Sequence, residues 1–140
     1  FPYTTLFRSY EAYKKSGPNV LGVEALQGDD GCTGVKVNTA DGYADYLFSA
    51  TDMQAHHPSK RVSFCGGLGL IREKEGQIQL MYLGCGRSLK KGNFVLESDH
   101  DVYAAIYMQH GVWYYSATGP VRVKIGKETK ELNEGYNQKL

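Results

Sequence analysis

The sequence lacks the features that mark several large classes of protein. No apolar run approaches the ~18–20 residues that a membrane-spanning helix requires. Sixteen basic and fifteen acidic residues leave a formal net charge of +1, which argues against a nucleic-acid-binding protein or a polybasic membrane-binding module. Almost no segment repeats its apolar residues at helical spacing, so a helical bundle is not expected. From these absences we predict that the protein binds neither nucleic acid nor a membrane.

Residues that bind metals or act as nucleophiles are few and scattered. Cys32, Cys65 and Cys85 form no CxxC pair, and we interpret them as buried or turn-adjacent thiols. A single Cys65–Cys85 disulfide between neighbouring strands remains the alternative. His56 and His57 stand in a polar loop, but zinc sites draw three or four ligands at regular spacings, and no such set is present. We therefore predict no metal site and no cofactor.

Two further motifs suggest chemistry but have simpler explanations. In Asp99-His100-Asp101 a carboxylate beside an imidazole can orient it as a base, yet the triplet also has the composition of a turn between two strands, which we favour. The run at residues 66–69 (GGLG) resembles a phosphate-binding loop, but the sequence that follows is typical of a strand rather than a helix. Close strand packing or a bulge explains these glycines better. We assign no catalytic residue.

Glycine and tyrosine are abundant. Seventeen of the 140 residues are glycine, above the usual share of about 7%, and eleven are tyrosine. This composition favours many short strands joined by tight turns. Hydrophobic residues make up 41% of the chain, which is enough for the core of one domain. We predict an all-β fold: an antiparallel stacked-sheet or β-sandwich (supersandwich-like) module.

Alternating apolar and polar residues locate ten or eleven short strands. Because each strand buries one face only, two sheets must pack together. We expect turns at residues 28–31, 73–76, 84–86 and 99–101, a two-residue type I′ turn at Asp41-Gly42, and a polar loop at residues 51–60. The expected strands cover residues 19–27, 35–38, 43–49, 61–64, 68–72, 77–83, 94–96, 101–109, 111–116 and 121–125, with one edge strand in residues 127–140.

An aromatic group in the last third of the chain is the candidate binding site. It consists of Tyr103, Tyr107, Trp113, Tyr114 and Tyr115. Aromatic faces stack on the apolar faces of sugar rings, and neighbouring Lys and Arg side chains suit an acidic polysaccharide. Aromatic residues in strands also fill cores and form cross-strand pairs. We name Trp113, Tyr114 and Tyr115 as candidate substrate-binding residues.

The first nine residues, FPYTTLFRS, match the translation of the end of a common short-read sequencing adaptor. We expect residues 1–9 to be an adaptor-derived artefact and exclude them from the fold. Residues 10–140 are then expected to be the C-terminal β-sandwich region of a larger, truncated protein.

Residues 34–52 (GVKVNTADGYADYLFSATD) and 62–98 (VSFCGGLGLIREKEGQIQLMYLGCGRSLKKGNFVLES) carry a family resemblance. A strand with Asp45 to Phe48 precedes a glycine-rich strand ending in Arg72. An acidic turn at Glu75-Gly76 and an apolar strand follow. This order resembles the C-terminal β-rich tail of the heparinase II/III-like polysaccharide lyases.

The resemblance implies a secreted or periplasmic lyase that cleaves uronate-containing polysaccharide by β-elimination. In that family an α/α-toroid domain and earlier sheet strands supply the active site, so no catalytic residue is transferred to this chain. The region would brace the toroid and be inactive alone, with one apolar face covered by the missing domain, and an acidic polysaccharide is the candidate ligand. The alternative is a non-catalytic carbohydrate-binding or structural β-sandwich module of a secreted protein, which would bind through residues 113–115.

Overall fold

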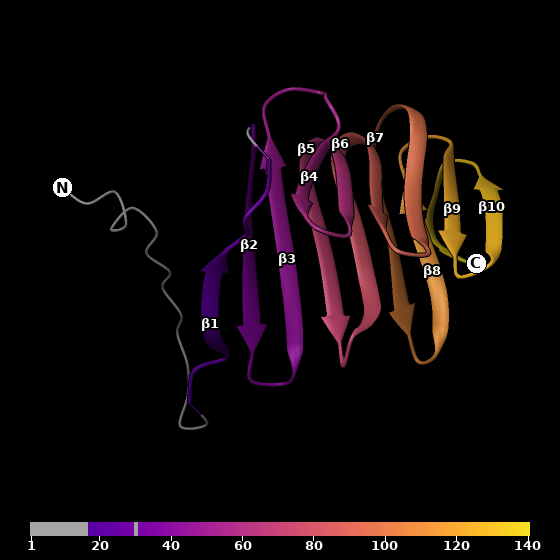
Figure 1. The fold of residues 1–140 in the computed structure, drawn as a ribbon. Coiled ribbons are helices and arrows are strands. Elements are labelled where there is room, and N and C mark those ends of the chain that lie inside the picture. The colour runs from indigo at the N-terminus through magenta and orange to yellow at the C-terminus, as the bar shows by residue number, and fades with distance from the viewer. Residues whose placement is uncertain (1–16, 30) are drawn as a thin grey trace.

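The structure, a computed structural model, describes residues 17–29 and 31–140 (Figure 1). Residues 1–9, the expected adaptor remnant, lie outside the described residues. Within the described part every strand pairing is antiparallel, and no helix is long and apolar enough to cross a membrane. The strands are β1 (Val20–Ala25), β2 (Cys32–Thr39), β3 (Tyr43–Ala50), β4 (His56–Ser59), β5 (Val62–Lys74), β6 (Gln77–Lys91), β7 (Phe94–Gln109), β8 (Val112–Ala117), β9 (Val121–Ile125), β10 (Glu128–Leu132) and β11 (Gly135–Lys139).

These strands form one continuous sheet that folds over itself into two layers. The large layer has the order β1-β2-β3-β5-β6-β7-β8-β11, in which residues 68–74 of β5 pair with β3. The small layer contains β4, β9 and β10 together with the other ends of the three long strands. There residues 62–65 of β5 lie between β4 and β6, and residues 94–97 of β7 lie between β6 and β9. The long strands β5, β6 and β7 therefore belong to both layers.

One pair of glycines lies where β5 and β6 pass from one layer to the other. Gly66 and Gly86 are partners across β5 and β6, and the register of β6 shifts here against both of its neighbours, β5 and β7. A Cβ atom on Gly86 would lie 2.8 Å from the Gly66 Cα and 2.5 Å from a methyl carbon of Leu83. Real Cβ atoms do not come so close to backbone, so any side chain at position 86 would push the two strands apart.

The core lies between the two layers. Phe48 of the large layer and Phe64 of the small layer meet with ring centroids 6.0 Å apart. Both layers contribute side chains that are fully or almost fully buried, among them Ile71, Met81, Leu83, Leu89, Leu96 and Ile106. The all-β antiparallel class and the packing of two layers are confirmed, although the layers belong to a single sheet.

Several expected breaks between strands are continuous strand in the structure. Residues 61–64 and 68–72 join into β5, because Gly66 and Leu68 continue the pairing with β6 and the extra residue at the register shift, Arg87, lies on β6. The expected turns at residues 84–86 and 99–101 lie inside β6 and β7, where a bend replaces a reversal of the chain. Close strand packing, one of the two explanations favoured over a phosphate loop, is what the structure shows for Gly66, where an added Cβ would lie 2.9 Å from the Gly86 Cα.

Three turn and loop predictions also differ from the structure. Asp41-Gly42 does join a hairpin, but the loop has three residues and a positive φ only at Gly42, so it is not a type I′ turn. The polar loop at 51–60 contains β4, where Pro58 is tolerated because β4 is an edge strand of the small layer. The C-terminal segment forms two strands, β10 and β11, instead of one.

Substitution of Gly86 tests the layer change. We expect Gly86→Ala to lower the free energy of unfolding by about 1–3 kcal/mol, since the added methyl group overpacks the close contact between β5 and β6. Urea denaturation followed by circular dichroism measures the loss. Gly22→Ala is the matched control, because its Cβ would have only one neighbour, at 4.0 Å. Equal losses in the two variants would contradict the close approach.

Candidate functional site

The outer face of the large layer carries apolar side chains where a solvent-facing sheet surface normally carries polar ones. The strand registers place Val35, Leu47 and Leu70 in one row across β2, β3 and β5. Val23 of β1 is 53% exposed and Leu68 of β5 is 44% exposed. We call this surface the outer face and define it by residues on alternate positions of neighbouring strands: Val23, Val35, Val37, Leu47, Leu68 and Leu70.

An ion pair interrupts the outer face. The Arg72 guanidinium donates two hydrogen bonds to Asp45, each with an N···O distance of 2.7 Å. This contact raises the pKa of Arg72, and the guanidinium also lies 5.1 Å from the centre of the Tyr43 ring. The two hydrogen bonds link β3 to β5. Because the two charges neutralise each other, the pair leaves no excess charge for an ionic ligand.

The small layer presents a polar outer surface. Glu97 of β7 accepts from Lys90 at 2.7 Å and from Arg122 at 3.0 Å, and Arg122 also contacts Glu131 at 2.5 Å. The hydrogen bond from Lys90 is the largest cause of the lowered pKa of Glu97. The two cations and two carboxylates balance, so this network offers no net positive charge to a uronate. The two faces of the molecule therefore differ: one is largely apolar, and the other carries a network of paired charges.

The predicted substrate-binding residues do not share one face. Trp113 packs against Phe94 between the layers, with ring centroids 5.8 Å apart. Tyr115, two positions on, is 8% exposed and belongs to the core. Tyr114 points to the other side and stacks on Tyr107, with ring centroids 6.0 Å apart and planes at 17°. Sugar binding by these residues remains a prediction.

Two exposed tyrosines lie near the last strands of the large layer. Tyr103, which the sequence analysis grouped with residues 113–115, is 55% exposed at the start of the second half of β7. Tyr136, which the sequence analysis did not single out, is 78% exposed on β11. The pairing of β11 with β8 brings Tyr136 near β7, and no sequence signal indicated that pairing.

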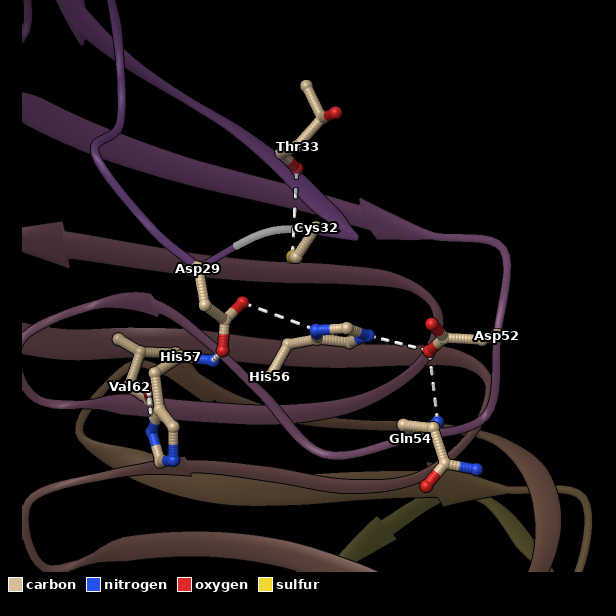
Figure 2. A network of polar contacts seen from close by, with 8 residues as sticks. All are labelled: Asp29, Cys32, Thr33, Asp52, Gln54, His56, His57 and Val62. Carbon is tan, nitrogen blue, oxygen red and sulfur yellow. Dashed lines mark hydrogen bonds and ion pairs between the residues drawn. The ribbon is translucent and has the colours of Figure 1, made fainter.

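A buried histidine joins three segments near one end of the sheet, as Figure 2 shows. His56 on β4 is 6% exposed, and its ring nitrogens contact two carboxylates. Nε2 lies 2.6 Å from Asp52, and Nδ1 lies 3.2 Å from Asp29. The Asp29 carboxylate also accepts from the backbone N–H of His57 at 2.7 Å. We call Asp29, His56 and Asp52 the histidine clamp.

The clamp favours the protonated form of the His56 imidazole. The pKa of His56 is raised, mainly by its hydrogen bond to Asp52, and the pKa of Asp52 is lowered by the same contact. An imidazolium donates from both nitrogens, which satisfies both carboxylates. Since both nitrogens are occupied, His56 has no free position from which to take a proton from a substrate.

The remaining candidate residues do not converge on a reactive centre. His57 points away from His56, with its Nδ1 3.2 Å from the Val62 carbonyl. No group of three or more metal-ligating side chains occurs among the described residues. In the triplet at 99–101, Asp101 binds Arg87 at 2.8 Å instead of orienting His100.

The three cysteines are free thiols. Burial raises the pKa of Cys32 and of Cys65, so neither is poised as a thiolate. The Cys65 thiol donates to the Met53 carbonyl at 3.2 Å.

Comparison with known proteins adds one finding. A family model described as the endo-acting ulvan lyase C-terminal domain matches residues 20–108, from the start of β1 to the next-to-last residue of β7. No curated protein and no solved structure matches the chain. The matched segment contains the contact between Gly66 and Gly86, the histidine clamp and the outer face.

The clamp predicts a pH dependence of stability. Because the pKa of His56 is raised above its unfolded value of 6.5, its contribution is complete below that pH and is lost as the pH rises through the folded pKa. The contribution of Asp52 acts in the opposite direction and is lost as the pH falls below its unfolded value of 3.8. Thermal melts at a series of pH values should show the unfolding temperature falling as the pH rises above 6.5.

His56→Gln should remove the alkaline decline, whereas His57→Gln, in which the clamp is intact, should retain it. An alkaline decline that is equal in both variants would show that another group causes it.

Proposed function

We propose a function from one premise: the chain belongs to the endo-acting ulvan lyase C-terminal domain family. It is thus part of a polysaccharide lyase, and its parent enzyme has an N-terminal catalytic domain and a polysaccharide substrate. We take that substrate to be ulvan, cleaved outside the cytoplasm by β-elimination at a uronate. We take residues 10–140 to be the C-terminal β region of this enzyme.

The domain braces the catalytic domain and does not carry the reaction. Beta-elimination requires a base that removes the proton at C5 of the uronate and a group that neutralises its carboxylate. Among the described residues, the buried histidine has both nitrogens bound to carboxylates. Arg72, Arg87 and Arg122 are each bound to carboxylates of the chain itself.

The outer face is the observation that supports bracing. Its apolar side chains lie on neighbouring strands, and if no other domain covered this face they would be left in water. Full burial of a Val or Leu side chain contributes about 1.5–3 kcal/mol. The heparinase II/III resemblance favours an α/α toroid as the domain that covers this face.

A non-catalytic carbohydrate-binding module is the second candidate. The sequence analysis expects such a module to bind through residues 113–115. Trp113 packs on Phe94, and Tyr115 is buried in the core. The outer face therefore supports the bracing role more strongly.

Charged substitutions on the outer face test the brace. In the isolated chain, Val23→Lys and Leu68→Lys should leave the unfolding midpoint almost unchanged, because both side chains are exposed there. In the parent lyase each should lower the stability of the β domain by about 2 kcal/mol, since docking would bury the new charge. Differential scanning calorimetry of both proteins gives the comparison.

Met53→Lys is the matched control, because Met53 is 39% exposed but lies in the loop before β4. Outer-face variants that behave like Met53→Lys in the parent enzyme would rule out docking through this face.

The isolated chain should also be inactive. We expect no new ultraviolet absorbance from unsaturated uronate when the purified chain is incubated with ulvan, because the proton-abstracting group belongs to the catalytic domain. Product formed at a rate proportional to the chain concentration, and lost after heat denaturation, would contradict the bracing role.

A further inference from the structure

A groove walled by tyrosines opens beside the outer face, at the edge of the large layer opposite β1. It has a volume of about 650 Å³, within the range of small-ligand pockets. Tyr82 of β6, Tyr103 of β7 and Tyr136 of β11 supply the aromatic walls. Short side chains, including those of Ala105 and Ser116, line the groove between them.

The strand order explains how the groove forms. Ala105 pairs with both Tyr82 and Ser116, so the small side chains of β7 and β8 lie beside the Tyr82 ring on one face. The register of β11 shifts between its pairings with β8, next to Tyr136. A large aromatic side chain with more than half of its surface in water is costly unless something covers it, and both Tyr103 and Tyr136 are in this state.

The charge of the groove indicates which ligand fits. Glu134 is the only charged residue among the residues that line it, and no Lys or Arg lies among them. A carboxylate repels the carboxylate of a uronate but accepts hydrogen bonds from sugar hydroxyls. Tyrosine rings stack on the C–H faces of pyranose rings and contribute hydroxyl groups at their edges.

We propose that this tyrosine groove binds a neutral sugar residue of the polysaccharide chain, which rests on the proposed function of the parent as a polysaccharide lyase. The aromatic walls stack on the ring, and the Glu134 carboxylate accepts from its hydroxyls. The groove thus holds part of the polymer outside the catalytic domain. It is a different site from residues 113–115, since those residues do not line it.

Affinity electrophoresis of the full chain in native gels that contain ulvan tests the site. The chain should be retarded by ulvan, and Tyr136→Ala and Tyr103→Ala should each weaken binding about tenfold. Tyr136→Phe should bind almost as well as the unmodified chain, because it keeps the ring and loses only the hydroxyl. Tyr43→Ala is the control: it also removes a tyrosine ring, but this ring lies beside Arg72 and Lys74 and does not line the groove. Unfolding midpoints of all variants separate lost binding from lost folding.

Two further arms test the neutral character of the bound ring. Xylo-oligosaccharides, which are neutral, should compete with ulvan, whereas galacturonate oligomers at the same concentration should compete much less. Glu134→Gln should weaken binding; tighter binding would show that the groove accepts an anionic sugar and would overturn the assignment.

Failure of this proposal is distinguishable from failure of the brace. An unmodified chain that is not retarded, or a Tyr136→Ala chain retarded as strongly as the control, overturns the groove and leaves the calorimetric test of docking unaffected. Loss of docking with retention of ulvan binding overturns the brace alone.

Discussion

The contact of Gly66 with Gly86 is the constraint on which the rest of the structure depends. Where these residues face each other, β5 and β6 come so close that a single methyl group would meet backbone atoms at 2.8 Å. The bend at this point sends one end of each long strand over the other end. One sheet thereby becomes two layers, and the large aromatic side chains Phe48 and Phe64 are buried between them.

Folding one sheet in this way gives the molecule two unlike surfaces. The small layer has a polar outer surface in which Glu97 is shared between Lys90 and Arg122. The large layer extends beyond the small one and carries apolar side chains on its outer side as well as toward the core. The ends of this layer then have separate roles in our account: the strands from β1 to β5 dock on the catalytic domain, and the tyrosine groove at β11 holds polysaccharide.

Alternation along single strands was sufficient to predict the all-β class and most strands, because a period of two residues is a local property. It could not predict which strands pair, so Asp29, which lies 27 residues from His56 in sequence, was not linked to it. The same alternation places the Tyr114 side chain on the opposite face of β8 from the side chains of Trp113 and Tyr115. Breaks were overpredicted at glycines, since a glycine inside a long strand can mark a bulge instead of an end.

The most direct test of the account is whether the outer face is covered in the parent lyase. Carbene footprinting of the isolated chain and of the whole enzyme labels exposed side chains in both. The account predicts that labelling of Val23, Leu47 and Leu70 falls in the whole enzyme while labelling of Val95 and Lys124, on the small layer, stays the same. Equal labelling of Val23, Leu47 and Leu70 in the two proteins would contradict it.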